Sequence, residues 1–474
     1  MIIQDNSLSV SEPLVRAQRI RLAKNSLFNL IGVVVPAVVA LICTVPLLAI
    51  LGPAKFGLAS IQLAVLVLLS VNDFGVSRAI VLVSISRGGF TQGNILAHTS
   101  RAGFELVLLL SAVILLVTVL GAAFFVIATQ QRPGDTLVSW LLVGIASAIA
   151  LPALPLRAKL EVEERFGLLN FLRSASSSAL FLAPLVAVWI EPTLTSVAIG
   201  HVISRAIVLA AFAARGGGEL FRGIGGTTAR LVAAIPKLDD FPTHTSLLSR
   251  GGWLGIAGLV SMLIGSADRF VLGALTTATA VAHYSVAAEL ATKLWLVVGA
   301  FLAAATPKIA AGWQQQDDSW RSPFLLLAIV VCSIALSANA ILNFFGVVIL
   351  HTWLGVGFDP EMVSVLAILS IGIALNCASQ LNYLILLVAG GERAAAKLQF
   401  LVLPLTIVAS LLVVPRWGAT GVAWVFTGRL ALDCFVIRHL TSARAGTKNS
   451  GISNTWLLVM AAISIGTYLG GRTF

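Results

Sequence analysis

Long apolar runs, separated by short polar segments, recur along the chain from residue 26 to residue 471. A helix needs roughly 20 apolar residues, at about 1.5 Å each, to cross a hydrocarbon core about 30 Å thick. Twelve runs meet this length, and a weaker thirteenth lies at 455–471. The twelve predicted spans are 26–50, 57–83, 104–128, 137–158, 168–190, 194–214, 252–274, 280–305, 323–348, 362–389, 396–414 and 418–438. The pattern predicts an all-α integral membrane protein.

The composition supports this fold class. Hydrophobic residues make up 58% of the chain and charged residues 11%, whereas ordinary soluble domains contain roughly 25% charged residues. The mean hydropathy is +0.98. The four cysteines lie inside apolar runs without metal-ligand or disulfide-framework spacing, so we interpret them as core residues and expect no metal and no cofactor. They are Cys43, Cys332, Cys377 and Cys434.

The net charge of +11 is explained by membrane topology. With the N-terminus in the cytoplasm, 22 of the 31 Lys and Arg residues fall in cytoplasmic tails and loops, and at most four fall in outer loops. Excess basic residues mark the cytoplasmic side of a membrane protein. We therefore expect a multi-pass protein of the bacterial cytoplasmic (inner) membrane, surrounded by lipids and without a nucleic-acid partner.

The chain divides into two halves of six predicted spans each. Leu51-Gly52 and Leu272-Gly273 match at an offset of 221 residues, and the segments ending in Arg205 and Arg429 match at an offset of 224. These offsets favour two pseudo-symmetric lobes with a cavity between them. The predicted organisation is a cytoplasmic tail 1–25, an N-lobe 26–214, a cytoplasmic loop 215–250, a C-lobe 251–440, and a C-terminal tail 441–474 that includes the possible extra helix 455–471.

Basic residues inside the predicted spans are candidates for substrate binding. Each ionisable group at the membrane centre costs at least about 2.5–3.5 kcal/mol, so such groups usually face a cavity or a partner. The helix rise places Arg205 and Arg429 about 20 Å and about 18 Å below the outer surface, near the midplane. Two such arginines would line one electropositive chamber suited to phosphate, which guanidinium binds bidentately. Arg269, Arg78 and Lys293 complete the basic set.

Acidic residues in the same spans are candidates for ion coupling or gating, and they are Asp73, Asp268, Glu289 and Asp433. Glu289 precedes Lys293 by one turn, and Arg429 precedes Asp433 by one turn. Both pairs are equally consistent with a structural role in which opposite charges make burial tolerable. Asp73 and Arg78 lie toward the inner end of the second span, where long side chains reach the interface and a structural role is favoured. Arg205 has no acidic residue three or four positions away, so it needs a partner from the other lobe or a bound anion.

Two absences narrow the function. The chain has no G-x-x-x-x-G-K-[ST] motif, which argues against ATP hydrolysis. The predicted outer loops have only about 4–12 residues, which leaves no room for an extramembrane catalytic domain. These features favour a secondary transporter, and we assign no catalytic residue.

Several motifs resemble the Wzx-type polysaccharide flippases of the multidrug/oligosaccharidyl-lipid/polysaccharide (MOP) exporter superfamily. The likeness covers about residues 20–440 in register. The motifs are Leu51-Gly52-Pro53-Ala54-Lys55-Phe56-Gly57-Leu58, Asp73-Phe74-Gly75-Val76-Ser77-Arg78-Ala79, Asp268-Arg269-Phe270-Val271-Leu272-Gly273, Tyr284-Ser285-Val286, Glu289-Leu290-Ala291-Thr292-Lys293-Leu294, Pro307, Gly390-Gly391-Glu392-Arg393, Pro415-Arg416-Trp417-Gly418-Ala419-Thr420-Gly421-Val422-Ala423-Trp424 and Arg429.

The resemblance implies a two-lobed bundle of twelve helices. Such a protein moves an undecaprenyl-pyrophosphate-linked oligosaccharide repeat unit from the cytoplasmic to the outer leaflet by alternating access. A proton or sodium gradient is expected to drive transport, and a polysaccharide polymerase and a chain-length regulator are expected partners. The possible thirteenth helix departs from the twelve-helix pattern.

Two rival functions fit parts of the sequence. An exporter of drugs or organic cations from the same superfamily is favoured if the carboxylates, and not the arginines, face the cavity. A membrane glycosyltransferase or polymerase would also act on lipid-linked sugars, but the short outer loops argue against it.

Overall fold

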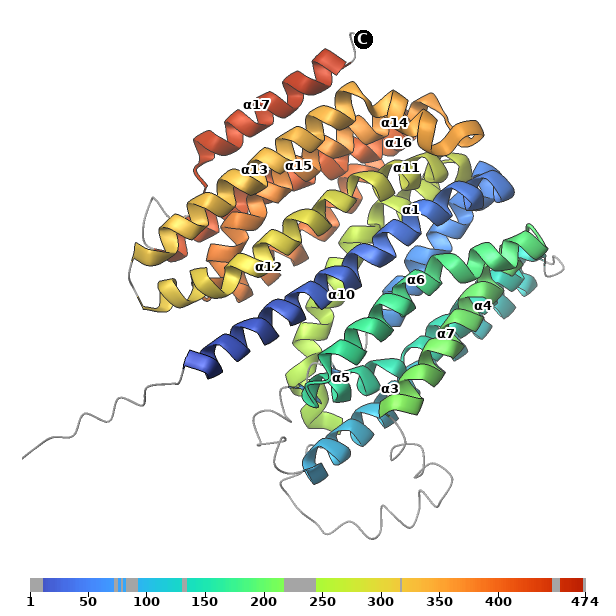
Figure 1. Ribbon diagram of the computed structural model, residues 1–474. Helices are drawn as coiled ribbons and strands as arrows, with labels where there is room; N and C mark the ends of the chain where they lie inside the picture. Colours follow the sequence, from blue (N-terminus) through green and yellow to red (C-terminus); the bar gives the residue numbers. More distant parts are fainter. Residues whose placement is uncertain are drawn as a thin grey trace, which may run out of the picture.

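The computed structural model describes residues 12–71, 76–77, 80–81, 93–129, 134–216, 244–315, 318–445 and 452–471. These residues form a bundle of α-helices with two short 3-10 helices and no strand among them (Figure 1). The first half contains α1 (Glu12–Val71), α3 (Gly93–Thr129), α4 (Asp135–Ala150), α5 (Ala153–Val162), α6 (Phe166–Ile190) and α7 (Leu194–Gly216). We call this set the N-lobe.

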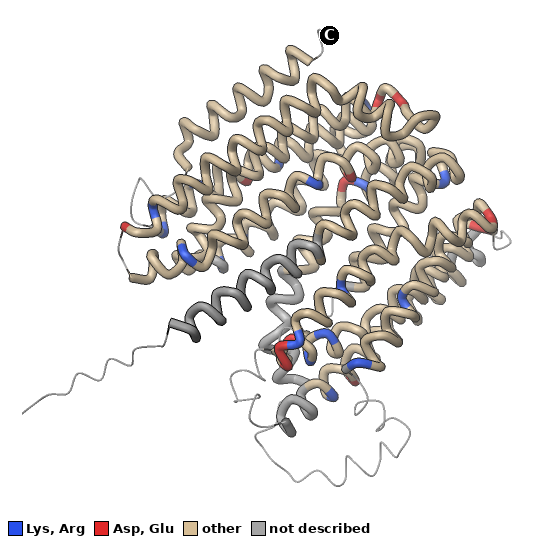
Figure 2. The backbone as a smooth tube through the Cα atoms, in the orientation of Figure 1, with Lys and Arg blue, Asp and Glu red and all other residues tan. Residues whose placement is uncertain are grey.

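The second half contains α10 (His244–Leu275), α11 (Ala278–Ala291), α12 (Lys293–Gln314), η1 (Asp318–Trp320), α13 (Arg321–Phe344), α14 (Gly346–Leu354), η2 (Gly355–Gly357), α15 (Pro360–Val388), α16 (Glu392–Ala445) and α17 (Asn454–Gly471). We call this set the C-lobe. The predicted all-α membrane fold is confirmed. Figure 2 shows long stretches of the helices without a charged residue, as helices surrounded by lipid require.

Ten helices within the described residues are long and apolar enough to cross a membrane, compared with twelve predicted spans. The difference arises partly at two glycines inside long helices. Gly52 divides α1 with φ 73° and ψ 163°, and Gly418 divides α16 with φ 51° and ψ −133°. Figure 1 shows the chain of α1 doubling back after its first arm. Positive φ is readily adopted only by glycine, so these two positions allow a change of direction without a loop.

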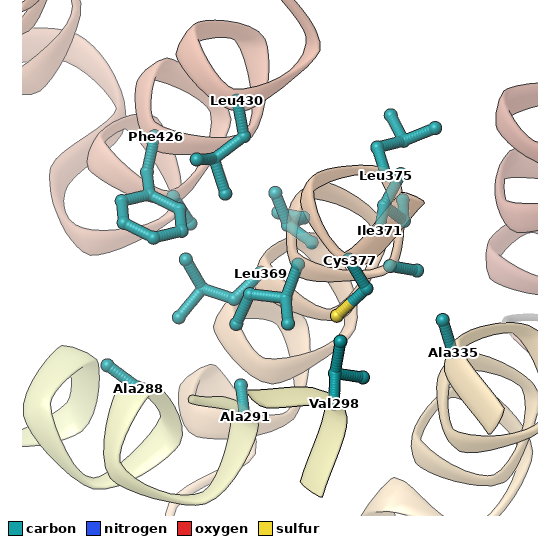
Figure 3. Close-up of a cluster of buried hydrophobic side chains, with 14 of the residues drawn as sticks. Ala288, Ala291, Val298, Ala335, Leu369, Ile371, Leu375, Cys377, Phe426 and Leu430 are labelled. Atoms are coloured by element: carbon teal, nitrogen blue, oxygen red, sulfur yellow. The ribbon is translucent and has the colours of Figure 1, made fainter. Parts of the chain in front are cut away.

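The C-lobe core forms around α15, which is buried along most of its length. Figure 3 shows Leu369, Ile371 and Cys377 of this helix among apolar side chains of α11, α12, α13 and α16. Hydroxyl and thiol groups of α16 donate to carbonyls of α15 every seven residues, from Thr427 to Ile368, from Cys434 to Leu375, and from Thr441 to Asn382. This constant offset shows that α15 and the second arm of α16 run parallel. The cysteines are free thiols, as predicted.

The extra helix predicted at 455–471 is present as α17. Asn339 of α13 donates to Thr467 of α17 at 2.7 Å, and Asn343 donates to Ser370 of α15 at 3.0 Å. A Cβ at Gly471 would lie 2.5 Å from the Asn343 carbonyl oxygen, so the helices are in close contact. The polar network therefore holds α17 against the outside of the C-lobe.

The two lobes contact each other at the end of the bundle that contains the Gly52 turn. A Cβ placed on Gly57 of α1 would lie 1.7 Å from the backbone oxygen of Ala278 at the start of α11. The Trp353 indole donates to the Leu41 carbonyl at 3.2 Å, and Leu48 lies under Gly357. We call this set of contacts the inter-lobe seal. It depends on the absence of a side chain at residue 57.

We predict that Gly57→Ala weakens the inter-lobe seal, because the new methyl group would overlap backbone atoms that no rotamer change can move. Overpacking of this kind costs about 1–3 kcal/mol. Thermal unfolding of the purified protein in detergent should show a lower midpoint. Gly299→Ala is the matched control, because no atom lies within 4 Å of a Cβ there. Equal midpoints for the two variants would contradict the importance of this contact.

Candidate functional site

The turn between α10 and α11 brings two charged residues of α10 against two hydroxyl residues of α11. The Tyr284 hydroxyl donates to Asp268, and the Arg269 Nε donates to Ser285 Oγ at 3.3 Å. Asp268 and Tyr284 are both buried. The hairpin explains the pairing, because each pair lies about eight residues on either side of the tight connection at 276–277. Asp268, a predicted coupling residue, therefore has a fixed partner within its own lobe.

The next charged pair lies where α11 ends and α12 begins. Lys293 Nζ donates to Glu289 Oε1, which is one turn earlier, and the side chains are only 24% and 22% exposed. The interruption at Thr292 separates the two helices but keeps the one-turn spacing. The predicted pair is therefore formed, and each charge neutralises the other.

Arg429 and Asp433 lie on α16 of the same lobe. The Arg429 guanidinium lies 4.9 Å from the centre of the Phe426 ring, which is a cation–π distance. Its Nε and the Oδ1 of the buried Asp433 have no hydrogen-bond partner among the described residues. Asp433 lies one turn after Arg429 on the same helix, so the two opposite charges are neighbours.

A cavity of about 220 Å³ lies between the lobes. Its polar lining includes Arg269, Ser285 and Glu289 of the C-lobe and His201 of α7 in the N-lobe. The remaining lining is mostly apolar and comes from α1, α6 and α7. Of the predicted site residues, Arg269 and Glu289 therefore face the space between the lobes. We call this space the central cavity.

A second cavity, of about 260 Å³, lies within the N-lobe. Arg205, Arg157 and Arg173 line it together with Ser176 and Ser177, and the described residues of the lining include no Asp or Glu. Figure 2 shows several Lys and Arg positions around α5, at this end of the N-lobe. Arg205 is buried, Arg157 is half-buried and Arg173 is exposed, so the positive charge extends from the interior of the cavity to its outer side. We call it the basic cavity.

Arg205 is the most buried of the three arginines of the basic cavity, with 8% of its surface exposed. Its Nη1 donates to Ser176 Oγ at 3.2 Å, while its buried Nε has no hydrogen-bond partner among the described residues. A buried donor without an acceptor costs about 1–3 kcal/mol, and more for a charged group. An anion in the basic cavity would remove this cost.

The predicted site residues do not all lie in one cavity. Arg269 and Glu289 line the central cavity, whereas Arg205 lines the basic cavity in the other lobe. Neither cavity is lined by both Arg205 and Arg429. The two arginines therefore do not share either of these cavities, whereas the sequence predicted one common chamber. Asp73 and Arg78 lie outside the described residues.

Sequence reasoning missed several residues of these cavities. Arg157 and Arg173 are among the 22 basic residues that the topology count places on the cytoplasmic side, and in the structure they lie on α5 and α6 and line the basic cavity. His201 is buried one turn before Arg205 on α7, and this spacing was a signal that could have drawn attention to it. Tyr284 and Ser285 were noted only as part of a motif and not as partners of Asp268 and Arg269.

Comparison with known proteins gives consistent matches over nearly the whole chain. Residues 22–313 match the family described as polysaccharide biosynthesis protein. A protein of Shigella flexneri named "Putative O-antigen transporter" is 23% identical over 429 residues, which cover 88% of this chain and 97% of that protein. The sequence is therefore similar to proteins of polysaccharide assembly.

Solved structures of MOP superfamily transporters have the same fold. An inward-facing multidrug resistance MATE family transporter matches with a TM-score of 0.63 at 15% identity, over 89% of this chain and 96% of that chain. An outward-facing transporter of that family matches with a TM-score of 0.56 at 14% identity, over 90% and 96%. A MOP superfamily transporter from Pyrococcus furiosus matches with a TM-score of 0.53 at 12% identity, over 95% and 94%.

We predict that Tyr284→Phe destabilises the protein by about 1–3 kcal/mol, because it removes the donor that satisfies the buried Asp268 carboxylate. Thermal unfolding in detergent should show the loss. Asp268→Asn is the comparison variant, since an amide oxygen can still accept from Tyr284 and a neutral group is less costly to bury. An unchanged unfolding midpoint for Tyr284→Phe would show that this hydrogen bond does not stabilise the lobe.

Proposed function

Because the chain belongs to the polysaccharide biosynthesis protein family, and to the MOP exporter fold, we propose that it is a secondary transporter that carries a lipid-linked oligosaccharide repeat unit across the cytoplasmic membrane. The proposed substrate has an undecaprenyl-pyrophosphate anchor. Transport proceeds from the cytoplasmic to the outer leaflet, with the N-terminus in the cytoplasm as the distribution of basic residues predicts.

The observation that carries this proposal is the basic cavity. Arg205 and Arg173 provide guanidinium groups, the lining residues that the structure describes include no carboxylate, and the Arg205 Nε has no acceptor among the described residues. Guanidinium forms short, charge-assisted hydrogen bonds to phosphate oxygens. A pyrophosphate would supply several such acceptors and two or more negative charges. An organic cation would be repelled from the same pocket.

The residues of the C-lobe suit ion coupling. Glu289 faces the central cavity and is held by Lys293. Protonation of Glu289, or binding of a sodium ion to it, would release Lys293 and change the charge that faces the N-lobe. Asp268 and Asp433 are further buried acids of this lobe, and the Tyr284 hydroxyl donates to Asp268. In this proposal the N-lobe binds the anion and the C-lobe responds to the ion gradient.

A polysaccharide polymerase and a chain-length regulator are the proposed partners, because a repeat unit delivered to the outer leaflet is a substrate for polymerisation there. The rival function is export of organic cations, and the observation that favours it is Glu289 in the central cavity. The Glu289–Lys293 pair weakens this alternative, since the lysine neutralises the carboxylate that a cation would need.

We predict that Arg205→Gln lowers export of the polysaccharide by at least about tenfold, because one charge-assisted hydrogen bond to phosphate is worth about 1.5–3 kcal/mol. Polymer at the cell surface and protein in the membrane are measured in the same strain. Arg205→Lys keeps the charge but not the bidentate geometry and should recover part of the activity.

Arg101→Gln is the matched control for Arg205→Gln, because Arg101 forms an exposed ion pair with Glu105 at 3.3 Å. Arg429→Gln tests the second predicted arginine in the same assay. Normal polymer at normal protein levels in the Arg205→Gln strain would remove the basic cavity from the mechanism.

We predict that Glu289→Gln abolishes the dependence of transport on an ion gradient. Flipping of a fluorescent lipid-linked oligosaccharide is measured in proteoliposomes with and without a proton or sodium gradient. The wild type should accelerate with the correct gradient, and Glu289→Gln should not, whereas the exposed Glu105→Gln should behave like the wild type. Gradient-independent flipping by the wild type would refute the coupling role.

A further inference from the structure

A group of three metal-ligating side chains lies near the inter-lobe seal, away from both cavities. His283 of α11 and Asp359 and Glu361 at the start of α15 each place one ligand atom within 4.8 Å of the others. His283 Nδ1 lies 2.7 Å from Glu361 Oε2 and 3.8 Å from Asp359 Oδ1. His283 is more than 70 positions from the two acidic residues in the chain, so the fold brings the three together.

Local structure holds two of the three groups in position. Asp359 is the N-cap of α15, where its Oδ1 accepts from the Glu361 backbone N–H at 2.8 Å, and Pro360 occupies the first helical position. This arrangement fixes the Asp359 backbone and side chain. The His283 side chain is only 9% exposed, so packing around α11 restricts its ring. The Glu361 side chain is 38% exposed and can adjust.

The distances suit a tetrahedral zinc ion. Zinc binds imidazole nitrogen and carboxylate oxygen at about 2.0–2.2 Å, so two ligand atoms on a tetrahedron lie about 3.4 Å apart. The observed separations of 2.7 Å and 3.8 Å bracket this value. A movement of less than about 1 Å, mostly by the partly exposed Glu361, would admit the ion.

The chemistry of the three ligands also selects the class of ion. Imidazole suits zinc and similar transition metals, whereas magnesium and calcium prefer oxygen ligands alone. A neutral histidine and two carboxylates balance the charge of a divalent ion. The carboxylates of Asp359 and Glu361 are 44% and 38% exposed, which gives the ion an entry path and leaves a fourth position for water.

We propose that His283, Asp359 and Glu361 form a binding site for a divalent transition metal ion, with zinc as the best fit, that joins α11 to the start of α15. The site adjoins the inter-lobe seal, because the backbone nitrogen of the neighbouring Ala282 would lie 3.1 Å from a Cβ on Gly57. The bound ion braces the segment of α11 against which the N-lobe closes. This role is separate from the proposed transport function.

The test is isothermal titration of zinc into the full-length protein, purified in detergent with a tag other than polyhistidine. The wild type should bind one zinc ion per chain and should unfold at a higher temperature when zinc is present. The double variant Asp359→Asn, Glu361→Gln should bind at least about 100-fold more weakly, because it lacks two of the three ligand groups.

The double variant is designed to fold like the wild type, since asparagine is a good N-cap and glutamine preserves the side-chain size. Equal unfolding midpoints without zinc verify this point. His283→Ala should also lose zinc binding, whereas His351→Ala, which removes an exposed histidine of α14, should bind zinc like the wild type. Absence of saturable zinc binding to the wild type, or equal binding by the double variant, would overturn the proposal.

Discussion

A guanidinium group inside a membrane-spanning bundle must find acceptors within the protein, face a water-filled cavity or bind an anion, because lipid tails cannot solvate it. The C-lobe meets this demand internally. Arg269 donates a hydrogen bond to Ser285, and Lys293 forms an ion pair with Glu289. Arg429 lies over an aromatic ring and one turn from an acidic residue. The N-lobe meets it only in part, because Arg205 has one hydroxyl acceptor and shares its cavity with two further arginines. This difference between the two lobes is the basis for proposing that the N-lobe binds the anion.

Helix α11 connects the inter-lobe seal to the central cavity. Its first turns contact α1 in the seal, and its last turns contain Glu289, which lines the central cavity. Tyr284 lies between these two positions and donates to Asp268 of α10. In the proposed function, a change in charge at Glu289 would act directly on the helix that forms the seal.

Much of the fold could be predicted from the sequence, because the bilayer determines the length of the apolar runs and the distribution of basic residues along the chain. Neither feature depends on how the helices pack against one another. The periodic charges also identified the Glu289–Lys293 pair, since residues four apart on one helix are neighbours whatever the surroundings. The two arms of α1 were predicted as separate spans, but the turn at Gly52 needs only one residue of positive φ. Hydropathy does not reveal such a turn.

The candidate site was harder to predict, because the helix rise gives the depth of a residue but not the direction in which its side chain points. Arg205 and Arg429 have similar predicted depths, yet Arg205 turns into the basic cavity of its own lobe while Arg429 lies against Phe426. Arg157 and Arg173 were counted as topological charges because they lie near predicted helix ends. Side-chain direction depends on how neighbouring helices pack, and a single sequence does not contain that information in a readable pattern.

The nature of the inter-lobe seal is consistent with lobes that separate during transport. Its central contact is between the backbone of α1 at Gly57 and the backbone of α11 at Ala278, with no interlocking side chains at that point. Contacts between small residues lose little when helices part, compared with large side chains that fill each other's cavities. Cavities of about 220 and 260 Å³ suit ions and phosphate groups but not an oligosaccharide. A repeat unit could therefore pass only if the lobes move apart, and the contact between small residues at Gly57 and Ala278 is suited to that movement.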